Sequence, residues 1–290
     1  MSGCSYEDST YNEGFVRGFI LAQLVVMITF EGLAMPITTS RRRFMSATPV
    51  AGGLALSGQL FTLWAQTRME NCRLSARPSK ATGSIPAGLH PLGLRAERDA
   101  LLYIPESAAK YQRAPLVVSL HGAGRKADRA IELLRSLSDE HGFLLLAPQS
   151  LDETWDAIQS TYGPDIAFLN QSLRRAFQMR NVDPARVAIA GFSDGASYAL
   201  SVGLSNGDFF NAVFGFSPGF IIPGEFIGRP RIFISHGTVD PILPIEECSR
   251  RIVPALRRSG YRVTYREFEG KHTLPPEIAS EAMRWFLKPA

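Results

Sequence analysis

Over the last two hundred residues of the chain, short runs of apolar residues alternate with longer segments in which apolar residues recur at helical spacing. Several of the short runs are almost continuously apolar, a pattern typical of strands that helices cover on both faces. The predicted strands span residues 100–104, 116–120, 143–147, 187–190, 212–216, 231–235 and 261–268.

Three segments between or after these strands carry a single apolar stripe and are predicted to be amphipathic helices. Their stripes are Ile166, Leu169, Leu173 and Phe177; Cys248, Ile252, Val253 and Leu256; and Ile278, Ala282, Met283 and Phe286. Strands alternating with helices predict an α/β fold with a doubly wound, mostly parallel sheet and helices on both faces. No internal repeat and no second catalytic domain is visible.

The first part of the chain has a different character and divides the sequence into three parts. Residues 1–66 are predicted to be a leader, 67–94 a linker rich in Arg, Ser, Pro and Gly, and 95–290 the catalytic domain. Within the leader, Ser40-Arg41-Arg42-Arg43-Phe44-Met45 precedes an uncharged, Ala/Gly/Leu-rich run. This arrangement resembles a twin-arginine export signal and predicts a periplasmic or extracellular protein. A membrane-anchored or a cytoplasmic protein is the alternative, and Met35 is a second candidate start.

Composition and charge exclude several classes of protein. The 290 residues are 45% hydrophobic and 20% charged, which are ordinary globular values. The net charge of +4 is uneven, because residues 1–80 carry eight Lys/Arg against five Asp/Glu, whereas residues 81–290 carry 23 against 22. The predicted catalytic domain therefore lacks the basic stripe that binding to a phosphate backbone requires, and no nucleic-acid partner is expected.

The cysteines and histidines give no sign of a metal site. Cys4, Cys72 and Cys248 are far apart and form no CxxC pair, and the histidines do not show the spacing of a zinc-binding helix. Two unrelated thiols are favoured for Cys72 and Cys248, although a bridge between them stays open. We expect no metal and no cofactor.

The segment Gly191-Phe192-Ser193-Asp194-Gly195 carries the candidate chemistry. It follows a predicted buried strand and precedes a small-residue helical start, which is the context of a nucleophile elbow. The two glycines are needed because a sharp strand-to-helix turn leaves no room for Cβ atoms two residues on either side of the serine. Ser193 is therefore the candidate nucleophile.

A serine hydroxyl needs a base to take its proton and an acid to orient that base. Two histidines follow Ser193. In His236-Gly237-Thr238-Val239-Asp240, the aspartate lies just after a predicted strand, so Asp240 is assigned as the acid and His272, in the loop after the last strand, as the base. His236 is interpreted as structural. Asp208 is the alternative acid, but its Asn-Gly-Asp turn favours local capping.

An oxyanion intermediate also requires backbone donors. One is the N–H of Asp194 at the start of the predicted helix. The other is expected in the Gly-rich turn His121-Gly122-Ala123-Gly124 after the strand at 116–120, with Ala123 as the donor. His121 is expected to fix this loop rather than to transfer protons.

Taken together, these four motifs look like the bacterial phospholipase/carboxylesterase family of α/β-hydrolases and the related polyhydroxybutyrate depolymerase-like esterases. The resemblance covers about residues 94–287. It implies the α/β-hydrolase fold and cofactor-independent hydrolysis of carboxylic esters, with Ser193, Asp240 and His272 as the triad and Ala123 and Asp194 as the oxyanion donors. One departure is Asp194 itself, where many family members carry a neutral Gln.

The expected substrate is a small or moderately sized ester, because no lid-like insertion is visible between residues 196 and 231. Trp155 and Phe192 are candidates to contact the acyl group, together with Tyr162 and Phe220. The alternatives are a depolymerase or peptidase of the same fold, or an exported binding module that has lost catalysis. A dienelactone hydrolase is disfavoured because its nucleophile would be a cysteine.

Overall fold

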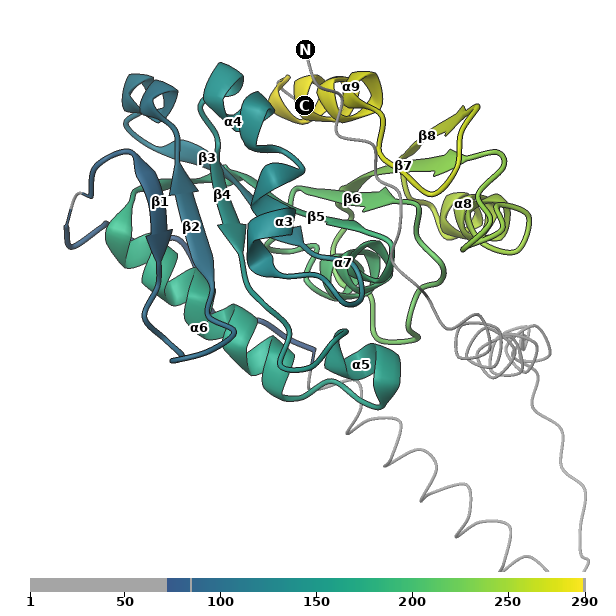
Figure 1. The fold of residues 1–290 in the computed structure, drawn as a ribbon, viewed down its shortest axis with the longest axis horizontal. Helices are drawn as coiled ribbons and strands as arrows, with labels where there is room; N and C mark the ends of the chain where they lie inside the picture. The colour runs from purple at the N-terminus through teal and green to yellow at the C-terminus, as the bar shows by residue number, and fades with distance from the viewer. Residues whose placement is uncertain (1–71, 84, 289–290) are drawn as a thin grey trace, which may run out of the picture. The chain divides into compact units, whose positions relative to one another are not determined.

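A computed structural model describes residues 72–83 and 85–288, and the predicted leader lies outside these residues. The described chain forms one eight-stranded sheet in the order β1-β2-β4-β3-β5-β6-β7-β8 (Figure 1). The strands are β1 (Gly88–Pro91), β2 (Leu101–Ile104), β3 (Ala114–Leu120), β4 (Leu144–Ala147), β5 (Val182–Phe192), β6 (Ala212–Phe216), β7 (Arg231–Gly237) and β8 (Val263–Phe268).

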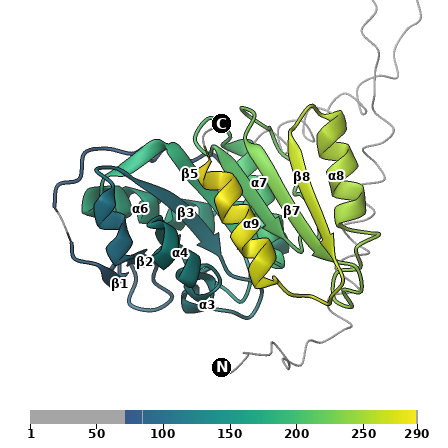
Figure 2. The same ribbon diagram turned by 90° about the horizontal axis from the view of Figure 1, so that it is seen from above.

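Helices lie on both faces of this sheet, as predicted (Figures 1 and 2). They are the 3-10 helix η1 (Glu106–Lys110) and the α-helices α3 (Ala127–Glu132), α4 (Arg135–His141), α5 (Asp156–Gln159), α6 (Pro164–Met179), α7 (Asp194–Ser205), α8 (Ser249–Arg258) and α9 (Pro276–Leu287). Helices α3, α4 and α9 cover one face, and α6, α7 and α8 cover the other.

The sheet is parallel from β4 to β8, and only β1 and β2 run antiparallel to their neighbours. Every residue of β3 is buried, which explains why its sequence is apolar except for Ser119 rather than alternating. Because parallel strands share a carboxyl edge, the loops after β3, β4, β5, β7 and β8 meet on one side of the sheet.

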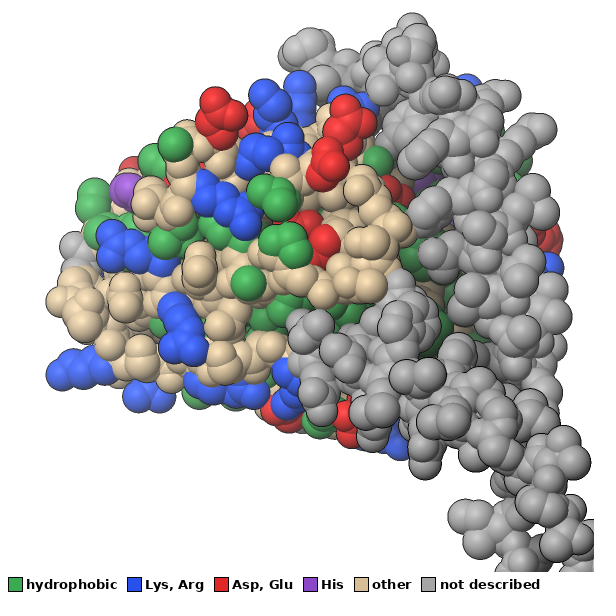
Figure 3. Space-filling view, turned by 90° about the horizontal axis from the view of Figure 1, so that it is seen from below, with side chains coloured by type: hydrophobic (Ala, Val, Ile, Leu, Met, Phe, Trp, Pro, Cys, Tyr) green, Lys and Arg blue, Asp and Glu red, His purple; other side chains and the backbone are tan. Residues whose placement is uncertain are grey.

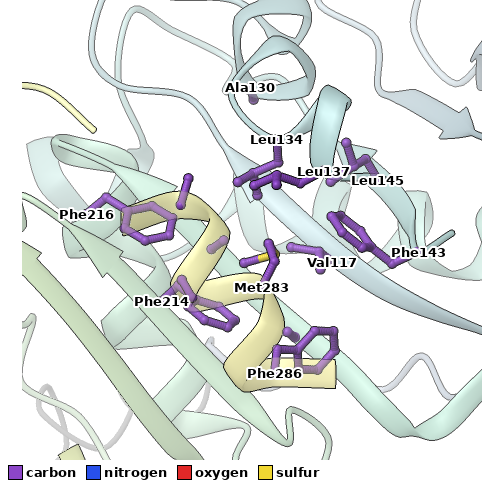
Figure 4. Packing of buried hydrophobic residues seen from close by; sticks show 14 of the residues in the cluster. Val117, Ala130, Leu134, Leu137, Phe143, Leu145, Phe214, Phe216, Met283 and Phe286 are labelled. Carbon is purple, nitrogen blue, oxygen red and sulfur yellow. The ribbon is translucent and has the colours of Figure 1, made fainter. Parts of the chain in front are cut away.

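One hydrophobic cluster joins the sheet to helices α3, α4 and α9. Val117 of β3 and Phe214 of β6 belong to this cluster together with Met283 and Phe286 of α9 (Figure 4). Leu134, beside α4, extends the cluster over the same face of the sheet. The apolar stripe predicted at 278–286 is therefore the face of α9 that is turned toward the sheet, since Ile278, Ala282, Met283 and Phe286 are all buried.

The connection from β6 to β7 contains no helix, and no large lid is present in the described structure. Residues 217–230 instead follow α7. Backbone N–H groups of Gly219 and Ile222 donate to the hydroxyls of Ser197 and Ser201 at 3.0 and 2.9 Å, and both serines lie on α7.

The described part of the predicted linker contains no helix and, before residue 95, only the strand β1, but its first residues are fixed by contacts with the rest of the fold. Residues 72–83, which we call the N-terminal strap, are held by side-chain amides. Asn206 accepts from the Leu74 N–H at 2.8 Å and donates to the Cys72 carbonyl at 2.9 Å. Asn170 accepts from the Ala76 N–H at 2.8 Å.

The strap also buries apolar side chains and forms ion pairs. Cys72, Leu74 and Ala76 are buried, while Arg73 and Arg77 both pair with Asp208 at 3.0 Å. The carboxylate of Asp208, the alternative acid in the sequence, is therefore engaged in ion pairs with the strap. Cys72 and Cys248 are both buried, and no disulfide joins them within the described residues.

Strand β1 was missed for a local reason. It is a four-residue edge strand containing Gly88 and Pro91, and its residues are only partly buried or exposed, so it lacks the apolar run of the central strands. Over the coloured part of the face in Figure 3, Lys and Arg side chains are interspersed with acidic and uncharged ones. Within residues 72–83 and 85–288, no helix has the length and apolar character needed to cross a membrane.

The strap predicts a stability difference between two amides. Asn206→Ala removes the side-chain partner of three buried backbone groups, the Leu74 N–H and the Cys72 and Val202 carbonyls, and is expected to cost about 2–3 kcal/mol of unfolding free energy. Asn170→Ala is the matched control: Asn170 is partly exposed, water replaces its lost bonds, and the cost is expected to be below about 1 kcal/mol. Urea unfolding of residues 68–290 measures the unfolding free energy of both variants. Equal losses of unfolding free energy would contradict the conclusion that Asn206 holds the strap in place.

Candidate active site

Ser193 lies between β5 and α7 in a backbone conformation that non-glycine residues seldom adopt. Its φ and ψ are 58° and −123°. A Cβ on Gly191 would lie 2.0 Å from the Gly195 carbonyl oxygen, and a Cβ on Gly195 would lie 2.4 Å from the Leu120 carbonyl oxygen. The steric reason predicted for the two glycines is thus present in the structure, and this turn has the geometry of a nucleophile elbow.

Asp240 and His272, the predicted acid and base, are hydrogen-bonded to each other. The His272 Nδ1 lies 2.6 Å from Asp240 Oδ2, while Asp240 Oδ1 accepts from the N–H groups of Ile242 and Leu243, both at 2.9 Å. With its proton on Nδ1, His272 has a lone pair on Nε2 that is able to accept a proton.

The Asp240 carboxylate is held in its ionised form. Burial opposes ionisation, but the hydrogen bonds from His236 and His272 outweigh burial and lower the pKa of Asp240 well below its ordinary value. An ionised acid at this position fixes the ring orientation of His272 and stabilises a positive charge on it.

Close backbone contacts bring the loop after β7 to the loop after β8. A Cβ on Gly237 would lie 2.3 Å from the Lys271 carbonyl oxygen, and the Val239 N–H donates to the Gly270 carbonyl at 3.1 Å. The ring of His272 in turn lies 4.7 Å from that of Phe192, the residue before Ser193. The structure therefore brings the three predicted triad residues to the same edge of the sheet.

The predicted oxyanion loop runs directly against the elbow. A Cβ on Gly122 would lie 3.3 Å from both the Phe192 carbonyl oxygen and Ser193 Cβ. Ala123 is the next residue of this loop. On the other side, Asp194 is the first residue of α7, where a backbone N–H has no partner within the helix. Both predicted donor residues are thus adjacent to the nucleophile turn.

His121 braces this loop. Its Nδ1 lies 2.9 Å from the Gly122 carbonyl oxygen, and its Nε2 accepts from the Ser150 N–H at 3.0 Å. Burial lowers the pKa of His121 to about 4. The ring is therefore neutral at pH 7 and both ring nitrogens are occupied, which matches the structural role expected for it.

His236 is likewise structural. It is fully buried, its Nδ1 lies 2.7 Å from the Ser249 hydroxyl, and its Nε2 donates to the Leu243 carbonyl at 2.8 Å. The same Nε2 lies 3.3 Å from Asp240 Oδ2. His236 thus contacts the predicted acid from within the core, and both of its ring nitrogens are engaged.

The expectation that Trp155 contacts the acyl group is wrong. Its side chain is 1% exposed and donates from Nε1 to the His121 carbonyl at 3.0 Å, while its ring stacks on Tyr198 at 5.0 Å. Trp155 therefore supports the oxyanion loop from within the core. Phe192 is half-buried beside His272 and keeps a surface that a substrate can contact.

Three further residues support the site and were missed in the sequence. Tyr198 donates its hydroxyl to Asp156 at 2.9 Å, and Asp156 also accepts from the Gly163 N–H at 2.8 Å. Thr154 donates its hydroxyl to Asp194 at 2.7 Å. Acidic residues just before a predicted helix are a capping signal that indicates Asp156, but no sequence pattern pairs Thr154 with Asp194.

No cluster of three or more His, Cys, Asp or Glu side chains suited to a metal ion occurs in residues 72–83 and 85–288. Ser193, His272 and Asp240, at the carboxyl edge of the sheet, are residue types that occur together in the arrangement used in acyl transfer.

Comparison with known proteins gives a family match and several structures of similar fold. Residues 149–288 match the model of a family described as phospholipase/carboxylesterase. The structure is similar to a phospholipase/carboxylesterase from Dyadobacter fermentans DSM 18053, with 21% identity over 65% of this chain and 96% of that chain and a TM-score of 0.50. It is also similar to the Bacillus cereus carboxylesterase, with 16% identity, coverage of 66% and 94%, and a TM-score of 0.51.

A third similar structure is a fluorophosphonate-binding serine hydrolase from Staphylococcus aureus, with 14% identity, coverage of 71% and 100%, and a TM-score of 0.54. The protein is therefore an α/β-hydrolase by fold. The family it matches is the phospholipase/carboxylesterase family, which confirms the resemblance seen in the sequence and supports a hydrolase of the esterase type.

The buried neutral state of His121 predicts a pH-dependent stability. Its pKa of about 4 in the folded protein lies below the value of about 6.5 expected in the unfolded chain, so the unfolded state binds more protons between these values. The contribution of neutral His121 is complete above pH 6.5 and is lost as the pH falls toward 4.

In unfolding experiments at pH 4 to 7.5, the free-energy advantage of the wild type over His121→Gln is expected to shrink by roughly 2–3 kcal/mol from the upper to the lower end. A constant difference across this range would contradict a neutral, buried His121.

Proposed function

We propose that the protein is a serine esterase that cleaves carboxylic esters through an acyl-serine intermediate. The observation that carries this proposal is the 2.6 Å hydrogen bond between His272 and Asp240, made by a histidine whose ring packs against the residue before a strained Ser193. A histidine oriented by an ionised acid beside an elbow serine is the arrangement that activates a hydroxyl nucleophile.

In the proposed reaction, His272 Nε2 takes the Ser193 proton while Oγ attacks the ester carbonyl carbon. The N–H groups of Ala123 and Asp194 stabilise the oxyanion, and His272 then gives its proton to the leaving alcohol. Water attacks the resulting acyl-serine with His272 as the base, which releases the carboxylic acid and restores Ser193. Asp240 stays ionised throughout.

Small or moderately sized acyl groups fit this site best. The connection from β6 to β7 follows α7 and no large lid is present in the described residues, so a long lipid chain has no cap to shield it. We therefore propose acetyl to butyryl esters as the preferred class, in place of long-chain lipids, peptides or polymeric esters.

The test is hydrolysis of 4-nitrophenyl acetate, butyrate and palmitate by residues 68–290 and by Ser193→Ala. We expect turnover of the two short esters, and a loss of about 10⁴-fold or more in kcat for Ser193→Ala, because the triad acts as a unit. A fluorophosphonate probe is expected to label the native protein and not the variant.

Asp208→Asn is the matched control for this experiment, since Asp208 pairs with the strap and its loss leaves the proposed triad intact. No turnover and no labelling of Ser193 would overturn the esterase and favour a binding module. A preference for palmitate or for a peptide substrate would overturn the proposed substrate class.

We also propose that the protein is exported. The support is the sequence Ser40–Met45 and the uncharged run that follows it. The full chain expressed in a bacterium with a twin-arginine pathway is expected to appear in the periplasm, and the double change Arg41→Lys, Arg42→Lys to retain it in the cytoplasm. The same distribution of both chains between periplasm and cytoplasm would contradict this proposal.

A further inference from the structure

The two neighbours of Ser193 differ in chemical character. Phe192, on the strand side, packs its ring on His272. Asp194, on the helix side, is half-buried and holds a carboxylate whose Oδ2 accepts the Thr154 hydroxyl proton at 2.7 Å. The candidate nucleophile is thus flanked by an acidic group that takes no part in the proposed triad.

The Asp240 carboxylate is not available to a substrate. It is 6% exposed and is already engaged by the N–H groups of Ile242 and Leu243 and by His272. For Asp194, Thr154 is the one hydrogen-bond donor among residues 72–83 and 85–288. Asp194 therefore keeps acceptor capacity next to the reacting serine.

A carboxylate at this position opposes the proposed reaction with a neutral ester. Negative charge develops on the substrate oxygen, and the backbone N–H of the same residue, Asp194, is one of its proposed donors. The carboxylate is also poorly solvated: burial raises the pKa of Asp194, against the hydrogen bond from Thr154 and a smaller electrostatic influence of His272. A positive charge on the substrate close to Asp194 offsets both the repulsion between the carboxylate and the developing oxyanion and the poor solvation of the carboxylate.

We infer that Asp194 makes the site selective for esters that carry a positive charge close to the scissile bond, over neutral esters of the same shape and over anionic ones. This inference rests on the proposed esterase function. Specificity here is a difference between two interactions, attraction of the Asp194 carboxylate for a cation and its repulsion of an anion.

The test uses three acetates that share one acyl group: acetylcholine, its uncharged isostere 3,3-dimethylbutyl acetate, and the anionic 3-sulfopropyl acetate. Hydrolysis is followed by pH-stat at pH 7.5. We expect kcat/KM to be about tenfold higher for acetylcholine than for the isostere, as one partly solvated charge pair allows, and lowest for the sulfonate. In Asp194→Asn the ratio between the first two esters is expected to fall to about 1.

Two further variants separate a local effect of Asp194 from other causes. Glu153→Gln removes the same charge from an exposed position on the loop that carries Thr154, and is expected to keep the wild-type ratio. Thr154→Val removes the hydrogen bond and keeps the Asp194 charge, so it is expected to retain a preference for acetylcholine. A fluorophosphonate label on Ser193 verifies that Asp194→Asn is folded.

The outcomes distinguish this inference from the proposed function. Labelling of Ser193 and turnover of the neutral acetate, with a wild-type ratio near 1 or a ratio unchanged in Asp194→Asn, would overturn the inference and leave the esterase intact. If Glu153→Gln lowered the ratio of kcat/KM for acetylcholine to kcat/KM for the isostere as much as Asp194→Asn does, the inference would also be overturned. The preference would then come from long-range electrostatics and not from Asp194 itself. Failure of both labelling and turnover would overturn the two together.

Discussion

The left-handed backbone of Ser193 is the constraint on which the rest of the site depends. A side chain held at a φ of 58° costs about 1–3 kcal/mol, so the surrounding structure must enforce it. Enforcement comes from backbone packed directly on backbone, with Gly191 against Gly195 and Gly195 against the end of β3. The same contacts set how closely the turn at Ser193 approaches the predicted oxyanion loop, so the backbone strain and the positions of these two loops have one origin.

The loops around this turn are held by buried polar side chains. His121 and Trp155 tie the oxyanion loop to the segment after β4, and Tyr198 ties that segment to α7 through Asp156. On the other side, His236 supports Asp240 from below. Each of these groups is satisfied by a partner within the fold, as buried polar groups in folded proteins usually are.

Sequence reasoning succeeded where the signal was local or followed from chain order. The strand β6 was placed at residues 212–216, as observed, because a central parallel strand is apolar on both faces. The pairing of Asp240 with His272 followed from the order nucleophile, acid, base, and the structure joins them at 2.6 Å. Such signals depend on one segment or on topology alone.

Sequence patterns do not show which distant polar partners hold a segment in place. The strap has a loop-like composition, yet Asn206 binds its backbone across 132 residues of chain, and no periodicity records this. Trp155 was misplaced for a related reason: an aromatic residue near the site suits a pocket wall as well as a core support, and the partner of its Nε1 decides between them. The contact of Thr154 with Asp194 is of the same kind. Side chains that act through distant hydrogen bonds are therefore the part of this site that only the folded structure reveals. The elbow and the order of the triad are shared features of the fold, so these side chains are also the part that distinguishes one hydrolase of this fold from another.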